Sequence, residues 1–258
     1  MEKKQFVCLS GLPRSGSTLL SAILDQNPNI HAEGNSAVCQ LMADVYISCT
    51  TPGKSIEQLM ANNRDQTVHD LVSGIRGIYY KNVKKPIIVD KCRSWTLEGN
   101  FQMSKLFIDP NIKMIVLERS VTEIVKSFGK LYKKNNNNRL TVERLLAPMS
   151  EPLMRSIAGL EWAKKHNEHN NFLFITYNEL INDTKSTIDK IYAFCGWEPF
   201  AHDFCNITNN HPENDEVYGL HGQHTIRAKV EKLENNIKLP EEVYKKCITI
   251  DKLLGYIK

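Results

Sequence analysis

Short apolar runs alternate with segments of helical periodicity along most of this chain. Strands buried on both faces read as continuous apolar runs rather than as alternating patterns. The runs that are rich in Ile, Val, Leu and Phe therefore predict buried strands at Phe6–Leu9, Pro86–Val89, Lys113–Leu117 and Phe172–Ile175. Because helical patterns separate these runs, the sequence predicts parallel βαβ units with helices on both faces of the sheet.

Between the predicted strands, apolar residues recur at a spacing of three and four, which is typical of amphipathic helices. Start and stop signals frame several of these segments. Helices are accordingly expected at Thr18–Asp25, at Thr67–Asn82, from a capping box at Ser120–Glu123, before Gly196, and from Pro240 onward. The polar run Lys133–Arg139 is expected to be an exposed loop, with a lid over a substrate as an open alternative.

The first predicted strand leads into Gly11-Leu12-Pro13-Arg14-Ser15-Gly16-Ser17-Thr18 and then into the first predicted helix. A glycine-bounded turn before a helix binds phosphate through its backbone N–H groups and the helix dipole. The spacing matches the P-loop pattern G-x-x-x-x-G-K-[ST], except that Ser17 stands where the pattern has Lys. Arg14, whose planar guanidinium suits phosphate or sulfate, is the compensating cation. The loop therefore favours an anion other than a magnesium triphosphate, and a plain helix-capping turn is the alternative.

Composition narrows the class of protein. The 258 residues are 41% hydrophobic and 24% charged, as in an ordinary globular protein, and we expect one domain spanning residues 1–258. A net charge of +4 is too small to indicate nucleic acid, but it suits an anionic cosubstrate. No membrane span or signal peptide is expected from the apolar runs. The seven cysteines show no C-x-x-C spacing, which favours reduced thiols and a cytoplasmic location.

The stretch Leu12–Leu19 resembles the 5′-phosphosulfate-binding loop of the sulfotransferases, in the variant of the tyrosylprotein and bacterial branches. The resemblance implies transfer of a sulfuryl group from 3′-phosphoadenosine 5′-phosphosulfate (PAPS) to a hydroxyl of a small molecule, glycan or tyrosine, with PAP as product. It also implies a P-loop NTPase-like three-layer α/β sandwich with a central parallel sheet of about five strands. The loop residues that would bind the cosubstrate are Arg14, Ser15, Gly16, Ser17 and Thr18.

PAPS has a second anionic group, the 3′-phosphate, which requires a second site. Arg119 and Ser127 stand eight residues apart, at a predicted strand end and in the following helix, and they resemble the family's 3′-phosphate motif. Taken alone, Arg119 would be interpreted as a surface charge at the start of a helix and Ser127 as a neutral helix residue. Leu131 stands where the tyrosylprotein branch has a further Arg, and Lys130 is near enough to substitute.

Two later segments also resemble cosubstrate-binding parts of the family. Tyr177 follows the fourth predicted strand in a segment similar to the family's Tyr-Glu-x-Leu, where the Tyr helps to hold the 3′-phosphate side. Arg227 and Lys229 match the basic residue of the loop that covers the cosubstrate. The alternatives are that Tyr177 simply packs on the core and that Arg227 and Lys229 are a solvated pair of charges. His221 and His224 lie nearby without an evident further ligand, so no metal is expected.

Sulfuryl transfer needs a base near the acceptor hydroxyl and a cation near the bridging oxygen of the leaving phosphate. The resemblance to the tyrosylprotein branch implies Glu33 as the base, and His31 is the rival. Lys91 follows the second of the apolar runs in an Asp-Lys pair like that of the family, and charged residues at such strand ends line the ligand crevice. Lys91 and Arg14 are thus the expected catalytic cations, and Arg93 is a candidate contact for the acceptor or the sulfate.

Two other functions stay open at this point. A P-loop nucleotide kinase-like phosphotransferase is disfavoured because Ser17 occupies the lysine position. A catalytically inactive nucleotide-binding module is disfavoured because Glu33 and Lys91 are both present. The expected partner is a hydroxyl-bearing acceptor, with a homodimer as a further possibility and with neither nucleic acid nor a membrane expected.

Overall fold

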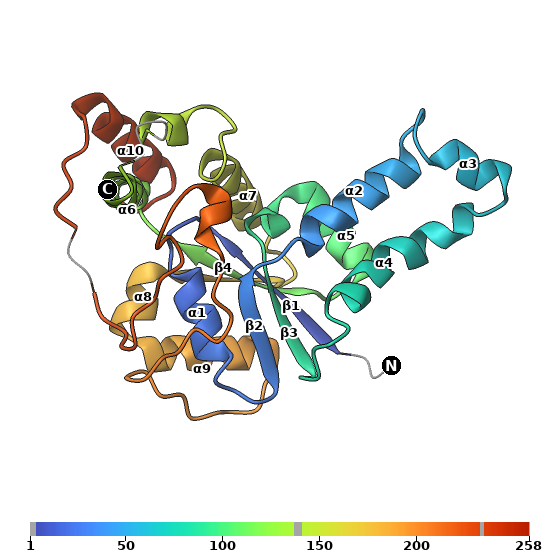
Figure 1. Ribbon diagram of the computed structural model, residues 1–258, viewed down its shortest axis with the longest axis horizontal. Coiled ribbons are helices and arrows are strands. Elements are labelled where there is room, and N and C mark those ends of the chain that lie inside the picture. The colour runs from blue at the N-terminus through green and yellow to red at the C-terminus, as the bar shows by residue number, and fades with distance from the viewer. Residues whose placement is uncertain (1–3, 137–140, 233–234, 258) are drawn as a thin grey trace.

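A single parallel sheet in the order β2-β3-β1-β4-β5 forms the centre of the protein (Figure 1). The computed structural model describes residues 4–136, 141–232 and 235–257. All the predicted apolar runs are strands, and β2, which is partly polar and carries Glu33, forms one edge of the sheet. The bounds are β1 (Gln5–Gly11), β2 (Ile30–Asn35), β3 (Ile87–Lys91), β4 (Lys113–Glu118) and β5 (Phe172–Thr176).

Helices cover both faces of this sheet, which confirms the predicted three-layer P-loop NTPase-like sandwich. The α-helices are α1 (Ser17–Leu24), α2 (Val38–Thr50), α3 (Ile56–Ala61), α4 (Val68–Tyr79), α5 (Glu98–Phe107), α6 (Val121–Lys134), α7 (Met154–Lys165), α8 (Tyr177–Asn182), α9 (Thr184–Cys195) and α10 (Glu241–Leu253). Short 3₁₀ turns lie at Asp65–Thr67, Arg93–Thr96, Glu143–Leu146 and Asp215–Tyr218.

Side chains of β1 point alternately into the two cores. Val7 and Leu9 pack with α1, α8 and α9, whereas Phe6 and Cys8 pack on the other face with α2, α4, α5, α6, α7 and α10. This alternation is the period-two geometry of a strand that is buried on both sides. The carboxyl end of β1 is therefore held from both faces, and the 11–18 loop starts from that fixed point.

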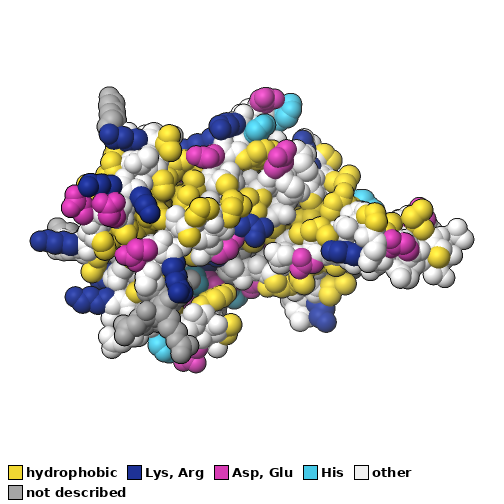
Figure 2. All heavy atoms as spheres, turned by 90° about the horizontal axis from the view of Figure 1, so that it is seen from above, with side chains coloured by type: hydrophobic (Ala, Val, Ile, Leu, Met, Phe, Trp, Pro, Cys, Tyr) yellow, Lys and Arg dark blue, Asp and Glu magenta, His cyan; other side chains and the backbone are white. Residues whose placement is uncertain are grey.

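Helices α2, α3 and α4 form an arm that extends from the body (Figure 1). The space-filling view shows apolar side chains along this arm (Figure 2). Its exposed large apolar residues include Leu41, Ile47, Met60, Leu71 and Ile78. Within the described parts of the chain, no helix combines the length and apolar character needed to cross a bilayer.

The start of α6 differs from the prediction. Ser120 makes no side-chain cap, so the predicted capping box is absent, and Glu123 bonds Lys126 instead, at 3.0 Å. A capping box does form at α8, where Thr176 and Glu179 exchange bonds. Sequence spacing predicts such boxes. At the start of α6, however, an acceptor from a distant part of the chain takes the place of the Ser120 hydroxyl.

That distant acceptor is Asp251 of α10, whose side chain is buried. Its carboxylate accepts bonds from the Ser120 hydroxyl at 2.8 Å, from the Val121 N–H at 2.5 Å, and from the Thr122 N–H and hydroxyl at 3.1 and 2.7 Å. A carboxylate at a helix N-terminus also interacts favourably with the helix dipole. The last helix thus fixes the start of α6. The α6 helix continues through Lys134, into the run expected to be a loop. Residues 137–139 of that run lie outside the described residues.

Replacing Asp251 with Ala should destabilise the protein by roughly 2–4 kcal/mol, because buried donors at the start of α6 lose their acceptor. Urea unfolding followed by circular dichroism would measure this change. The control is Asp189→Ala, which removes an exposed ion pair with Lys185 and should cost less than about 1 kcal/mol. Equal losses for the two variants would contradict the assigned role of Asp251.

Candidate functional site

The 11–18 loop follows the carboxyl end of β1 and runs directly against β4. Gly11 has φ +122°, and a Cβ atom at this position would lie 2.1 Å from the Leu117 carbonyl oxygen. Leu12 N–H donates to the same oxygen at 2.9 Å. Only glycine permits this approach, so the loop's position is set at its first residue.

Arg14 and Gly16 both adopt positive φ angles, 60° and 94°. For a residue with a side chain this region is uncommon, and such strain clusters at ligand sites. Gly16 then precedes α1 directly, so the loop ends at a helix N-terminus. These features together present backbone N–H groups and a positive dipole end to an anion.

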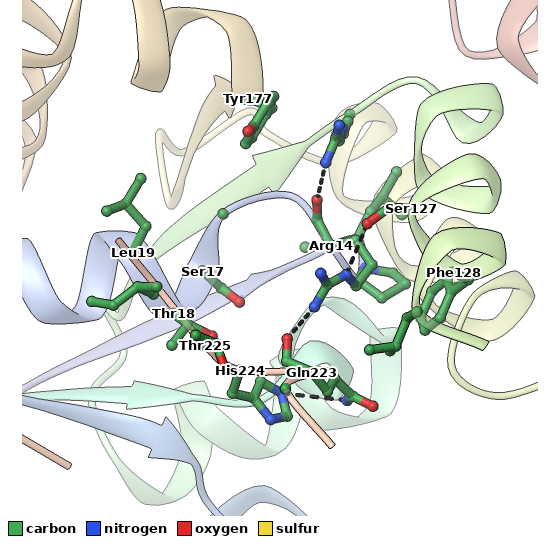
Figure 3. Close-up of a pocket in the computed structure, with 18 of the residues that line it drawn as sticks. Arg14, Ser17, Thr18, Leu19, Ser127, Phe128, Tyr177, Gln223, His224 and Thr225 are labelled. Atoms are coloured by element: carbon green, nitrogen blue, oxygen red, sulfur yellow. Dashed lines mark hydrogen bonds between the residues drawn. The ribbon is translucent and has the colours of Figure 1, made fainter. Parts of the chain in front are cut away.

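A cavity of about 420 Å³ opens beside this loop (Figure 3). It is lined by the loop, by the end of β3, by Arg119 directly after β4, by α6, by the start of α8, by residues of the 222–231 segment and by Asn235. The sequence-predicted residues in its lining are Arg14, Gly16, Ser17, Thr18, Lys91, Arg93, Arg119, Ser127, Lys130, Tyr177, Arg227 and Lys229. Ser15 is instead buried beneath the loop, where its hydroxyl donates to the Leu12 carbonyl at 2.5 Å.

Arg14 joins parts of the site that are far apart in the sequence. Its Nε donates to the Ser127 hydroxyl at 3.1 Å, and its guanidinium also donates to the Gln223 carbonyl (Figure 3). Arg119 donates to the Arg14 carbonyl at 2.7 Å, and its guanidinium carbon lies 4.0 Å from the centroid of the Tyr177 ring. The loop, the Arg/Ser pair and the Tyr, predicted separately, therefore form one cluster.

Both guanidinium groups are largely removed from water. Burial lowers the pKa of Arg14, and the nearby Arg119 lowers it further. Burial also lowers the pKa of Arg119. Since arginine stays protonated in proteins, two neighbouring positive charges persist at the cavity wall, and an anion bound there would relieve their repulsion.

Further lysines add to this positive wall. Lys130, expected to replace a missing arginine, lines the cavity, and so does Lys134, which the sequence did not single out. Both lie on the α6 face that carries Ser127, at helical spacing from it. Helical spacing from Ser127 points to Lys134. This residue was not singled out from the sequence because a loop was predicted from Lys133 onward.

Lys91, at the end of β3, contacts a carboxylate from a distant segment. Its Nζ lies 2.8 Å from Glu213 Oε1, and the other Glu213 oxygen lies 3.5 Å from His224 Nδ1. His224 Nδ1 is also 2.5 Å from Asp215 Oδ1. Sequence reasoning missed Glu213 and Asp215, because an acidic run in an irregular segment carries no spacing that relates it to a strand end elsewhere in the chain.

The expected base and its rival lie together on β2. His31 Nε2 is 3.2 Å from Glu33 Oε2, as the extended conformation of residues 31 and 33 allows. Neither residue is among those that line the cavity. Glu33 is followed by Gly34, against which the Glu213 side chain packs, so the β2 edge and Lys91 share Glu213 as a neighbour.

One group of side chains in the described residues has the spacing of metal ligands. Ligand atoms of Asp25, His31 and His211 lie within 4.8 Å of one another. However, Lys85 Nζ lies 2.8 Å from Asp25 Oδ1, and Asn210 donates to Oδ2 at 3.0 Å. The Asp25 charge is therefore already balanced by an ammonium group, which disfavours a cation here.

Comparisons with known proteins agree with this geometry. A family profile described as "Sulfotransferase family" matches residues 7–202. No curated protein matches the chain in sequence. Among solved structures, the sulfotransferase domain of the Synechococcus PCC 7002 olefin synthase superposes with a TM-score of 0.61 at 18% identity, covering 100% of this chain and 97% of that one.

Two more structures extend the comparison. A sulfotransferase from Alicyclobacillus acidocaldarius gives a TM-score of 0.55 at 12% identity and covers 100% of this chain and 98% of that one. Retinol dehydratase, in a complex with androsterone and the inactive cofactor PAP, gives a TM-score of 0.51 at 16% identity. This match covers 96% of this chain and 79% of that one. At these identities the superpositions show the shared fold.

Proposed function

Because the chain belongs to the sulfotransferase family and is therefore an enzyme that transfers a sulfuryl group, we propose that its donor is PAPS and its acceptor a hydroxyl group. The observation that carries this proposal is the cluster of Arg14, Ser127, Arg119 and Tyr177 around a loop without the P-loop lysine. In addition, Arg119 Nε is buried without a hydrogen-bond partner among the described residues, and a phosphate oxygen would satisfy it.

The two anionic ends of PAPS fit the two parts of the cluster. Arg14 and the 15–18 backbone would bind the 5′-phosphosulfate at the N-terminus of α1. Arg119, Ser127 and Tyr177 would bind the 3′-phosphate side. Arg227 and Lys229, which also line the cavity, would cover the cosubstrate.

For the chemical step, we assign Glu33 as the base and Lys91 as the cation on the leaving group. The acceptor hydroxyl loses its proton to Glu33 while its oxygen bonds to sulfur and the bond from sulfur to the phosphate oxygen breaks. Negative charge then develops on that oxygen, where the Lys91 ammonium and Arg14 would stabilise it. The acceptor would bind between Lys91 at the cavity wall and Glu33 on the adjoining strand β2, and His31 would orient Glu33 through their 3.2 Å contact.

The whole chain is proposed to act as one domain, since residues after 202 contribute to the cavity and to the support of α6. The proposed setting is the cytoplasm, and no metal is assigned to the reaction. A nucleotide kinase-like activity shares the fold, so a ligand comparison is the direct test. PAP at about 100 times its Kd should stabilise the protein by roughly 2.7 kcal/mol in thermal unfolding, whereas ATP with magnesium should not. A screen of hydroxyl acceptors with labelled PAPS would then identify the acceptor.

Replacing Arg14 with Ala should weaken PAP binding strongly, because no lysine in the loop can supply the charge. A charge-assisted hydrogen bond contributes roughly 1.5–3 kcal/mol, and a bidentate pair more. Isothermal calorimetry on the folded variant would measure the loss, with the exposed Arg64→Ala as the control. A dissociation constant for PAP within twofold of the wild-type value would contradict the assignment.

Replacing Arg119 with Ala should distinguish the two phosphate sites. PAP should lose far more affinity than adenosine 5′-phosphosulfate, which has no 3′-phosphate for Arg119 to bind. Competition binding with both ligands measures the ratio of the two losses. If both ligands weaken equally, Arg119 acts on the loop through the Arg14 carbonyl rather than on the 3′-phosphate.

Replacing Glu33 with Gln should preserve PAP binding and lower kcat by about 10²–10⁴, because the variant keeps its shape but cannot accept the proton. His31→Asn should have a much smaller effect. Steady-state kinetics with PAPS and binding of PAP separate the two quantities. A larger loss from the His31 variant would move the base to the imidazole.

A further inference from the structure

Lys91 is almost completely buried, and the side chain of its partner Glu213 is largely buried. The exposed fractions of the Lys91 and Glu213 side chains are 6% and 11%, with 2.8 Å between Nζ and Oε1. Glu213 belongs to the irregular segment after α9, beyond residue 202, where the match to the family ends. A residue outside the matched region therefore supplies the direct counter-charge of the catalytic cation.

The fold makes room for Glu213 at a specific place. A Cβ atom on Gly34 would lie 2.3 Å from Glu213 Cγ and 2.7 Å from Oε1. Gly34 has no positive φ angle, so conformational freedom does not explain this glycine. The absence of a side chain at residue 34 is what lets the Glu213 carboxylate reach Lys91 over the β2 edge.

The far oxygen of Glu213 lies next to His224. His224 Nδ1 lies 3.5 Å from Glu213 Oε2 and 2.5 Å from Asp215 Oδ1. The backbone N–H of His224 donates to Asp215 Oδ2 at 3.0 Å. His224 also lines the cavity. The bonds between His224 and Asp215 thereby hold the imidazole beside the Glu213 carboxylate.

The electrostatic surroundings explain why Lys91 needs this partner. Burial lowers the pKa of Lys91, and the nearby charge of Arg93 lowers it further. Glu213, and more weakly Asp215, raise the pKa of Lys91. Burial likewise lowers the pKa of His224, which favours a neutral imidazole beside the pair. Glu213 is thus the largest single influence that keeps the Lys91 ammonium protonated.

We propose that Glu213 is a positioning residue for sulfuryl transfer, which keeps the Lys91 ammonium charged and aimed into the cavity. The inference rests on the proposed role of Lys91 at the leaving oxygen. Lysine has three N–H donors, so Lys91 can bond to Glu213 and to the cosubstrate at the same time. Glu213 itself touches neither the donor nor the acceptor in this assignment.

The first test is Glu213→Gln, which keeps the shape and removes the charge. We expect kcat to fall by about 10- to 100-fold, as for other residues that support a catalytic group, and by less than for Lys91→Met. Glu216→Gln is the matched control, because Glu216 lies in the same segment with its side chain 72% exposed. Titration with PAP would give the fraction of folded protein, so that reduced stability does not count as reduced turnover.

The pH dependence separates positioning from proton transfer. Activity that needs a charged Lys91 falls as the pH rises through the pKa of Lys91. Removing the Glu213 charge lowers that pKa, so the alkaline fall should move to lower pH in Glu213→Gln. Titration of ¹³Cε-labelled lysine by NMR, with Lys91→Met to assign the signal, would show the same shift without any acceptor.

The second test moves Glu213 without changing any charge. In Gly34→Ala the new methyl group must displace the Glu213 side chain, so kcat and the NMR titration should change in the direction seen for Glu213→Gln. Gly74→Ala in α4 is its control, since a Cβ atom there meets nothing within 4 Å.

The outcomes distinguish this inference from the proposed function. If the wild-type protein binds PAP but shows no transfer from PAPS with any acceptor, the proposed function fails, whatever the variants do. If the wild type is active and Glu213→Gln retains its kcat and its alkaline limb, the positioning role is wrong. Loss of the acidic limb with an unchanged alkaline limb would instead make Glu213 the base, which also overturns the inference.

Discussion

The close approach of Gly11 to the Leu117 carbonyl is the constraint on which the rest of the site depends. It places the start of the loop against β4 at the carboxyl edge of the sheet, because no side chain separates the two backbones. Arg119, which follows β4 directly, can then reach the Arg14 carbonyl, and Arg14 can reach Ser127 on α6. A shift of β4 relative to β1 would move all three contacts together, so the register of these strands sets the geometry of the proposed cosubstrate site.

The predictions from sequence succeeded where the signal was local and strongly patterned. The apolar runs became strands, and the side chains expected at their ends, Lys91, Arg119 and Tyr177, line one cavity, as the geometry of parallel sheets requires. The Arg14 loop was recognisable because glycine spacing directly reflects backbone conformation. Assignment of Glu33 as the base depends on family resemblance, and its contact with His31 leaves the choice between the two to kinetics.

Contacts between distant segments could not be predicted in this way. The capping box at Ser120 was wrong because Asp251, far along the chain, offers a better acceptor, and no local pattern records that competition. Glu213 lies in a segment without periodicity, so nothing in its neighbourhood relates it to Lys91. β2 was missed as an apolar run because its second half, Glu33-Gly34-Asn35, is polar at the open edge of the sheet. For Ser120 and for Glu213, the deciding partner lies far away in sequence.

The bond between Asp251 and the start of α6 also has a consequence for biosynthesis. The carboxylate that fixes the helix bearing Ser127 lies 130 residues further along the chain than the N–H group of Val121 that it accepts from. During translation, β1 and the 11–18 loop can therefore form well before α6 is held firmly against them. Ser127 takes its place beside Arg14 only after α10 has been synthesised and has folded, and a variant that lacks α10 would hold Ser127 loosely.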